Sequence, residues 1–571
     1  MTAITPNEAA LSDRSATRDV ATAGVGQRLG AAARGLWHPL TAICAVQAAL
    51  SLALVWTNTA YIDEADYLWV GHLVIRNWLH GAPWPAALVK NILSGSPAIY
   101  PPIGALADNV AGLAGARVLS MLFMLGATVL LYSATSRLLG RGAAVIAAAL
   151  WAVSEPALRL TYATYDPLSV FLTTLSAWLI VKAAGSSGDA PAGQHSRRAI
   201  VFGALGAVAL GLANATAYSG IVINPVVVAF AFCVWWPVMT ARRALAYTAS
   251  FAAVLVASFA LIMVGTGSWA GTANVFNRQT HDHESLTLVV HEIWGYSGFL
   301  IALALLGVLI AFRLETRQRA SLVTLLGCAV FAAPAAQFHY GTAWSADKHV
   351  AYGFWFAAMA AGYGCAKVIA WPAGTRTRLI AAACAVAFIY PAVYGFSAAW
   401  QRYHLWPNSS AFVAALRPVV SHTSGLIYVP GHEANVAQYY LPQQGNDWQR
   451  WNAQLALNPA SLPVPVPRDK WASYYKSQVA RGTYGVLALF YSTTFTASSA
   501  LPGSVIANGK VTQRTLLGLV SDNSDEPGVG LLTEALERSR LYKLVRSGPY
   551  DITNINQTHS YGVFAIWKRV G

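Results

Sequence analysis

The residue types best suited to chemistry are acidic and gather just after the first apolar run of this sequence. Residues 61–67 read Tyr-Ile-Asp-Glu-Ala-Asp-Tyr and contain Asp63, Glu64 and Asp66. Asp166 stands apart, directly before a proline and another long apolar run. A carboxylate in such a place can take a proton from a hydroxyl group as a general base. Acids at a helix start also cap free amides and complement the helix dipole, so capping is an equally open interpretation.

The elements that must position these acids are membrane-spanning helices. The chain has 571 residues, of which 56% are hydrophobic and only 11% are charged, and its mean hydropathy is +0.45. A soluble domain carries roughly 25% charged residues, so most of this chain must lie in lipid. Apolar runs of about twenty residues recur up to position 400, each long enough to cross about 30 Å of hydrocarbon. We predict an α-helical polytopic membrane protein with about eleven transmembrane helices, at 39–59, 115–136, 142–156, 167–184, 199–217, 219–238, 245–266, 295–312, 321–338, 349–369 and 379–399.

The distribution of charge predicts the orientation of these helices. The formal net charge of +14 does not arise from one basic patch, which argues against a nucleic-acid partner. Basic residues concentrate instead on alternate connections between spans, as the positive-inside rule describes for cytoplasmic loops. We therefore expect a plasma-membrane protein with a cytoplasmic N-terminus and an extracytoplasmic C-terminal domain. The basic residues on the predicted inner side include Arg137, Arg141, Lys182, Arg197, Arg198, Arg242, Arg243, Arg313, Arg317, Arg319 and Lys367.

Composition divides the chain into three parts. Residues 1–38 are polar and read as a disordered cytoplasmic leader, and residues 39–400 form the transmembrane module. Within that module, the outer segment 60–114 is too long for a simple connector, and apolar side chains at helical spacing from Glu64 to His80 predict an interfacial helix. Residues 401–571 carry polar and charged residues at soluble frequency. Helix signals there alternate with strand signals at 425–429, 485–491 and 562–567, which indicates an α/β domain.

A second outer connection offers ligand types for a divalent metal ion. Its candidates are consecutive: His281, Asp282, His283 and Glu284. Neighbouring loop positions rarely complete a metal site without a ligand from elsewhere. The sequence requires no cofactor, and the metal stays an open option.

Several short motifs, in a fixed order, resemble a known group of enzymes. An Asp-Glu pair follows the first span, a long outer loop contains a Pro-Pro step, and later segments read Gly115-Ala-Arg-Val-Leu-Ser, Leu138-Leu-Gly-Arg and Tyr162-Ala-Thr-Tyr-Asp-Pro. This order resembles the polyprenyl-phosphate-sugar glycosyltransferases of the GT-C superfamily, nearest to the branch of protein O-mannosyltransferases and lipid A aminoarabinose transferases. The match covers roughly residues 40–185 by motif and 186–400 by topology.

The resemblance implies a hexosyl or pentosyl transfer, with inversion, from a polyprenyl-phosphate sugar to an acceptor hydroxyl at the outer membrane face. The acceptor is a lipid, a glycan or a protein, and the sequence leaves these open. By the family pattern, Asp63 matches the catalytic base, Glu64 supports it, and Asp166 matches the second acid. The residues expected to line the substrate site are Asp66, Tyr67, Tyr100 and Tyr165.

The departing phosphate needs positive partners. Relatives of the lipid A branch often carry a lysine directly before the Pro-Pro step, where this chain has Tyr100. The substitutes that we predict for phosphate binding are Lys90, Arg117, Arg278, Lys348 and His349.

The sequence leaves two other functions as alternatives to the transferase. A transporter or flippase would place ionisable groups near the bilayer midplane and would often contain inverted repeats. Here the acids lie at the outer ends of the predicted spans, which favours the transferase. The other alternative is a non-catalytic assembly factor with a degenerate site.

Overall fold

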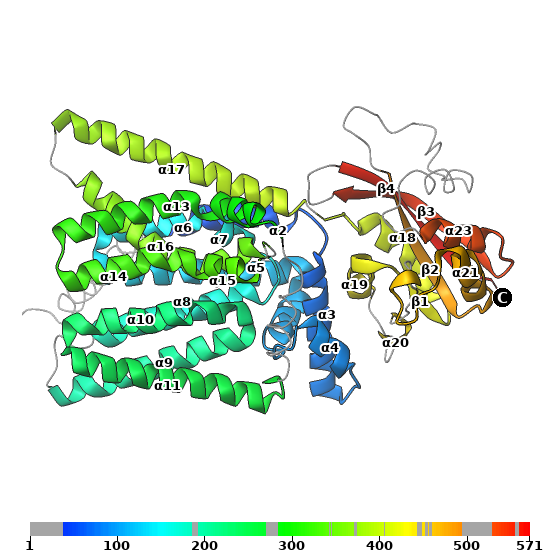
Figure 1. The fold of residues 1–571 in the computed structure, drawn as a ribbon, viewed down its shortest axis with the longest axis horizontal. Coiled ribbons are helices and arrows are strands. Elements are labelled where there is room, and N and C mark those ends of the chain that lie inside the picture. Colours follow the sequence, from blue (N-terminus) through cyan, green and yellow to red (C-terminus); the bar gives the residue numbers. More distant parts are fainter. Residues whose placement is uncertain are drawn as a thin grey trace, which may run out of the picture.

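The computed structural model contains a helical bundle and a smaller C-terminal domain with a β-sheet (Figure 1). The residues that it describes are 38–185, 192–269, 284–341, 343, 345–370, 374–404, 406–441, 448–451, 455, 459–493, 528–553 and 559–570.

Each of the eleven predicted spans overlaps a bundle helix. Within the part of the chain that the structure describes, seven segments are long and apolar enough to cross a membrane by length and composition. Two of the other expected spans are shorter than predicted, since α2 has 17 residues and α6 has 12. The bundle helices are α2 (Pro39–Val55), α5 (Tyr100–Leu139), α6 (Arg141–Ala152), α8 (Asp166–Gly185), α9 (Ala192–Thr216), α10 (Asn224–Trp235), α11 (Ala241–Gly265), α13 (Leu286–Leu314), α14 (Arg317–Cys328), α15 (Ala332–Tyr340), α16 (Ala346–Ile369) and α17 (Gly374–Arg402), with 3-10 turns η1 (Tyr218–Ile223), η2 (Trp236–Val238) and η3 (Ala329–Phe331).

Close backbone approaches place α16 at the centre of the bundle, where nearly all of its residues up to Gly364 are buried. A Cβ atom on Gly353 would lie 2.2 Å from the carbonyl oxygen of Ala329, and one on Gly362 would lie 2.4 Å from that of Ala143. Small residues at helix contacts are the usual means of tight packing in lipid, where the hydrophobic effect does not drive helices together. The position of α16 is therefore fixed by packing on several sides.

The two ends of the bundle differ in chemistry. At one end, Arg319 donates to the backbone carbonyl of Leu138 at 3.4 Å, and Lys367 forms an ion pair with Glu315 at 3.1 Å. These contacts join the ends of α5, α14 and α16 on the side predicted to be cytoplasmic. The opposite end carries the acidic residues of the first outer segment.

The outer segment begins with α3 (Ile62–His80), which includes the predicted interfacial helix and runs across the end of the bundle (Figure 1). After α4 (Ala86–Ile92), the first part of α5 packs beside α3, and a Cβ atom on Gly71 would lie only 2.0 Å from the carbonyl oxygen of Pro101. The backbone leaves helical geometry at Ala111 and Gly112, where Gly112 has φ of 62°. This kink turns α5 from its contact with α3 into the bundle.

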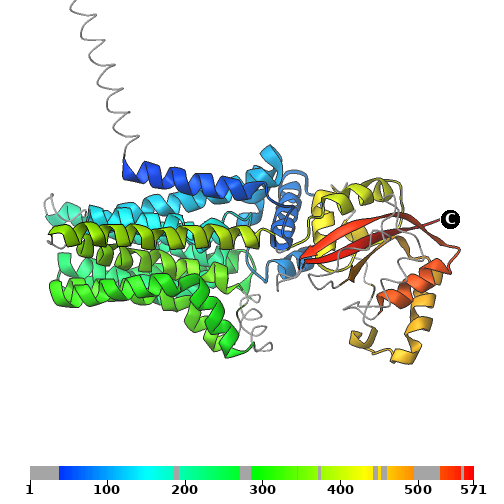
Figure 2. The same cartoon turned by 90° about the horizontal axis from the view of Figure 1, so that it is seen from above.

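The C-terminal domain has a four-stranded sheet in the order β1-β2-β4-β3, in which only β1 and β2 are parallel. Buried apolar side chains pack two helices on each face of the sheet, which gives an α/β domain. It lies at the same end of the bundle as α3 (Figures 1 and 2). The strands are β1 (Leu426–Tyr428), β2 (Tyr484–Thr493), β3 (Tyr542–Thr553) and β4 (His559–Arg569); the helices are α18 (Ser410–Ser421) and α19 (Gly431–Tyr440) on one face, α21 (Trp471–Ala480) and α23 (Val529–Glu537) on the other, and the short α20 (Trp448–Trp451), η4 (Pro459–Ser461) and η5 (Arg468–Lys470).

Candidate functional site

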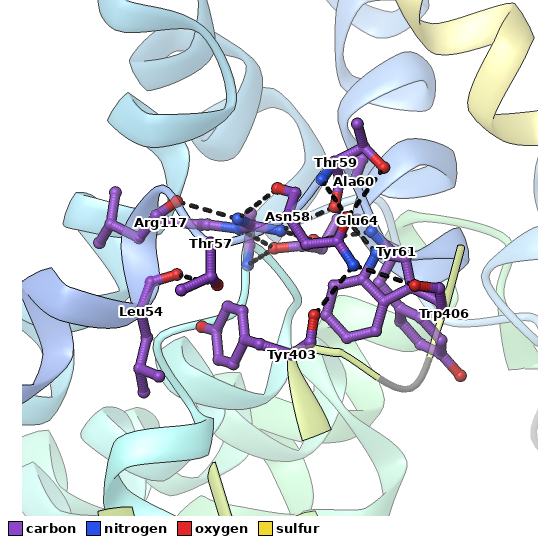
Figure 3. A network of polar contacts seen from close by, with 12 residues as sticks. Leu54, Thr57, Asn58, Thr59, Ala60, Tyr61, Glu64, Arg117, Tyr403 and Trp406 are labelled. Atoms are coloured by element: carbon purple, nitrogen blue, oxygen red, sulfur yellow. Dashed lines mark hydrogen bonds and ion pairs between the residues drawn. The ribbon is translucent and has the colours of Figure 1, made fainter. Parts of the chain in front are cut away.

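Glu64 and Arg117 form a fully buried ion pair that shapes the start of α3 (Figure 3). The guanidinium group donates to both carboxylate oxygens, at 2.8 Å from Nε and 2.7 Å from the second terminal nitrogen. The remaining guanidinium N–H groups donate to the backbone carbonyl oxygens of Val55, Asn58 and Thr59, with nitrogen–oxygen distances of 2.9, 3.0 and 3.1 Å. The five N–H donors of an arginine are thereby all used.

The carboxylate of Glu64 is equally occupied. Besides Arg117, it accepts hydrogen bonds from the backbone N–H groups of Tyr61 and Ala163, both at 2.9 Å. Glu64 therefore holds the turn before α3 against the segment before α8. Arg117, which we expected among the phosphate ligands, has no N–H group left for a phosphate in this arrangement, because its donors fix the backbone between α2 and α3.

Asp63 points elsewhere and meets two residues that are distant in sequence. The ammonium nitrogen of Lys348, on α16, lies 3.4 Å from Asp63 Oδ2 and 3.5 Å from Asp166 Oδ2. The side chain of Asp63 is 32% exposed, whereas that of Asp166 is fully buried at the start of α8. Thr164 donates to Asp166 Oδ2 at 3.3 Å, while Asp166 Oδ1 has no hydrogen-bond partner among the described residues. One cation thus bridges an accessible acid and a buried one.

Tyrosine rings surround this group of charges. Tyr67 stacks on Tyr165 with ring centroids 4.6 Å apart, and the ammonium nitrogen of Lys348 lies 5.8 Å from the centroid of Tyr165. Burial, with the nearby charge of Asp63, raises the pKa of Tyr67 well above its usual value, so this hydroxyl stays protonated. Tyr100 is fully buried, and its hydroxyl has no hydrogen-bond partner among the described residues.

The C-terminal domain contacts α3, the helix that carries Asp63, through α19. Asn435 donates to Asp66 Oδ2 at 3.2 Å, one turn beyond Asp63. Tyr439 donates to Asp108 Oδ1 at 2.6 Å, and His72 contacts the other oxygen of Asp108 at the same distance. These contacts link α19 to both α3 and α5 close to the candidate site.

A second charged group adjoins Lys348 and was missed by the sequence analysis. Asp347 forms an ion pair with Arg159 at 2.9 Å and lies 3.7 Å from Arg402, at the end of α17. Glu155 is buried beside this group in the short helix α7 (Glu155–Arg159). Burial and the charge of Asp347 raise the pKa of Glu155 to about 8. Glu155 and Arg159 lie in one predicted outer connection, and this could have indicated the group. Nothing in the sequence indicated that Arg402 is a partner of Asp347.

The other candidates do not join the Asp63 group. Lys90 is exposed on α4, and His349 contacts the side-chain amide of Gln337, on α15, at 3.0 Å. Arg278, His281, Asp282 and His283 lie outside the described residues. The carboxylate of Glu284 accepts a hydrogen bond from the backbone of Ala343. Among the described residues, no three histidine, cysteine or acidic side chains are placed to hold a metal ion.

Comparison with known proteins identifies the fold. No family model and no curated protein sequence matches this chain. The apo crystal structure of the Archaeoglobus fulgidus oligosaccharyltransferase superposes with a TM-score of 0.52 and 13% identity, covering 80% of this chain and 69% of that enzyme. The chain has the fold of the GT-C superfamily. The fold expected from the sequence motifs is thereby confirmed.

A GT-C neighbour of more similar length was also found. ArnT from Cupriavidus metallidurans, in a crystal structure described as bound to undecaprenyl phosphate, matches with a TM-score of 0.49 and 13% identity over 92% of this chain and 97% of that protein. The apo form of ArnT gives 0.48 and 14% identity, over 80% and 93% of the two chains. The likeness to the oligosaccharyltransferase, at 13% identity, shows the fold alone, so the activity has to be argued from the site.

Proposed function

We propose that this protein is a membrane glycosyltransferase that moves a single hexosyl or pentosyl group from a polyprenyl-phosphate donor to an acceptor hydroxyl at the outer membrane face. The observation that carries the proposal is the position of Lys348 between Asp63 and Asp166. This arrangement puts an accessible base, a cation and a buried acid within one site at one end of a GT-C bundle.

The exposure of the two acids suggests their roles. Asp63 is partly open to solvent, so an acceptor hydroxyl arriving from outside the membrane can reach it. Asp63 takes the proton of that hydroxyl, and the oxygen forms a bond to the anomeric carbon on the face opposite the phosphate. As this bond forms, the bond between the anomeric carbon and the phosphate oxygen breaks, its electron pair leaves with the phosphate oxygen, and the configuration at the anomeric carbon is inverted.

Lys348 supports the departure of the phosphate. A fixed cation stabilises the negative charge that develops on the leaving oxygen. Arg159 lies on the adjoining charged group and holds Asp347, the neighbour of Lys348. This contact keeps the first turn of α16 in place. The candidate metal ligands at 281–283 lie outside the described residues. No step of the proposed mechanism requires a divalent metal.

The proposal is tested by following release of polyprenyl phosphate from a purified polyprenyl-phosphate sugar, with a cell-envelope extract as the acceptor source. Asp63→Asn keeps the size of the side chain and removes the base, so we expect the rate to fall by about 10²- to 10⁴-fold. Asp469→Asn, at an exposed position in η5, is the matched control and should keep the wild-type rate. Release by Asp63→Asn at the wild-type rate would refute the base assignment.

A further inference from the structure

Polar side chains meet behind Asp166, one helical turn deeper along α8. The hydroxyl of Tyr352, on α16, donates to Ser169 Oγ at 2.8 Å, and Ser169 donates to the carbonyl oxygen of Ala213, on α9, at 2.9 Å. Asn214 is the next residue after Ala213 on α9. A Cβ atom on Gly220, in η1, would lie 3.2 Å from Ser169 Oγ and 3.4 Å from Asn214 Oδ1. We call Ser169, Asn214 and Tyr352 the inner polar group.

This group adjoins the candidate site. Ser169 is three residues from Asp166 on the same helix, and the hydroxyl of Tyr352 contacts Ser169. Ser169, Asn214 and Tyr352 are all buried, at 0, 1 and 3% exposure. The proposed chemistry at Asp63 and Lys348 does not use them.

Two acceptor oxygens in this region have no donor. Asp166 Oδ1 and Asn214 Oδ1 are buried and make no hydrogen bond among the described residues. The amide nitrogen of Asn214 donates to Asn224 Oδ1 at 3.1 Å, which sets the orientation of the amide and directs its oxygen to Gly220 and the inner polar group. Buried acceptors without donors are costly and uncommon in native proteins, so each calls for a partner.

The missing partners must be hydrogen-bond donors. Ring hydroxyl groups of a sugar supply such donors on neighbouring carbons. A sugar carboxylate would bring only acceptors and would place a negative charge beside Asp63 and Asp166, where Lys348 is the one cation of the described residues within 4 Å of either acid. Burying that charge without a partner is strongly unfavourable.

We infer that the inner polar group and Asp166 recognise the transferred sugar through its ring hydroxyls, and that this sugar carries no carboxylate. The inference rests on the proposed transferase function and adds the class of sugar, one specificity-determining residue, Asn214, and one positioning residue, Tyr352. Asn214 accepts a hydrogen bond from one ring hydroxyl. Tyr352 orients Ser169 through the hydrogen bond from its hydroxyl group.

The test uses matched polyprenyl-phosphate donors that carry glucose, mannose or galactose, the uronic acid of each, and deoxy analogues that lack one ring hydroxyl. The wild-type protein should transfer at least one of these neutral hexoses, or a neutral pentose such as xylose or arabinose supplied on the same lipid phosphate, and should transfer each uronic acid at less than a tenth of that rate. One deoxy analogue should lose about tenfold in kcat/KM with the wild type, which corresponds to one hydrogen bond of about 1.4 kcal/mol.

Asn214→Ala should show the same tenfold loss with the full sugar and no additional loss with that deoxy analogue, because the same contact is already absent. A general structural defect would instead lower the rates for all donors equally. Tyr352→Phe should raise the donor KM. Its matched control is Tyr363→Phe on the same helix, whose hydroxyl donates to Glu315 at the opposite end of the bundle, and this variant should keep the wild-type KM.

The results separate the inference from the function on which it rests. Equal transfer of uronic acids and neutral hexoses, or equal losses by Asn214→Ala for every deoxy donor, would overturn the inference while leaving the transferase in place. Failure of the wild type to use any lipid-phosphate sugar would overturn both. If Asn214→Ala does not fold, the rates of the wild-type protein with the deoxy donors still test the inference. Equal wild-type rates with every deoxy donor would contradict recognition of ring hydroxyls.

Discussion

At the scale of single residues, Lys348 joins two acids that lie 103 positions apart in the chain, as the numbers 63 and 166 show. Its ammonium group faces both carboxylates at similar distances, 3.4 and 3.5 Å. A leaving phosphate would therefore meet a cation that is already held in place and costs little reorganisation. The same ammonium group also keeps the two acids from facing each other as bare like charges.

We predict that Lys348→Met lowers kcat by about 10²- to 10³-fold, because the charge developing on the phosphate loses its cation. Lys348→Arg restores a positive charge and should recover part of the rate. Steady-state kinetics with a lipid-phosphate sugar provides the measurement, and Lys470→Met, at an exposed position in η5, provides the control. Equal rates for Lys348→Met and the control would remove Lys348 from the mechanism.

Asp66 gives a prediction about pH. Burial, and secondly the charge of Asp63, raises the pKa of Asp66 to about 8 in the folded protein, against about 3.9 for an unfolded chain. Ionisation is thus harder in the folded state, so this residue lowers stability progressively as pH rises from about 4 to about 8. Asp66→Asn removes that effect, and its melting temperature minus that of the wild type should increase over this range. A difference that stays constant or shrinks would contradict the assignment.

At the scale of elements, the Glu64 and Arg117 pair determines how α3 follows α2. The pair is buried, and its hydrogen bonds join the end of α2, the turn before α3, the middle of α5 and the segment before α8 (Figure 3). Asp63 is the residue before Glu64. Its side chain is therefore presented to Lys348 by an anchor that has no need to touch the substrate.

Breaking this anchor should destabilise the protein. Glu64→Gln leaves Arg117 buried without its counter-charge, which typically costs about 3–5 kcal/mol. Thermal unfolding in detergent measures the effect. Arg538→Met removes the arginine of an exposed pair with Glu534 on α23, where at most about 1 kcal/mol is expected. If Glu64→Gln melted no lower than Arg538→Met, the structural role of the pair would be refuted.

The spans could be predicted from the sequence, and the acids could be noticed there, because both follow from local patterns. Apolar length locates a helix in lipid, and an acid beside such a run is conspicuous. The role of Arg117 was not predictable in this way, because only the path of the chain decides whether its donors meet a phosphate or backbone carbonyls. Asn214 and Tyr352 escaped notice because they lie within or beside apolar runs, where single polar residues also serve helix packing.

The C-terminal sheet shows the same limit. Strands β1, β2 and β4 were predicted from their apolar runs, but β3 was not. It contains Gly548 and Pro549, which usually mark turns, and the structure places β3 at the edge of the sheet, where proline is tolerated. Pairing with β4 therefore overrides the local signal.

At the scale of the whole molecule, the basic end of the bundle and the candidate site lie on opposite sides. The C-terminal domain covers the site end and contacts α3 and α5 through Asn435 and Tyr439. An acceptor must therefore approach Asp63 beside this domain. In the predicted orientation the site faces the outside of the cell, which agrees with the proposed transfer at the outer membrane face.

The orientation can be tested by cysteine labelling of intact cells, in a background without native cysteines. Ser473→Cys, exposed on α21, should react with a membrane-impermeant maleimide. Arg242→Cys, exposed in the first turn of α11, should react only after the cells are permeabilised. Labelling in the reverse pattern would place the site on the cytoplasmic face.

The central claim is that Asp63 drives transfer of one sugar from a lipid monophosphate. It is tested most directly by a single-turnover reaction of the wild-type protein and Asp63→Asn with a polyprenyl-phosphate sugar of known anomeric configuration, in which mass spectrometry identifies the lipid product and NMR the new linkage. We predict that the wild type releases the polyprenyl monophosphate and forms a glycoside of inverted configuration, while Asp63→Asn forms almost none. Retained configuration, or an equal yield from Asp63→Asn, would contradict the mechanism.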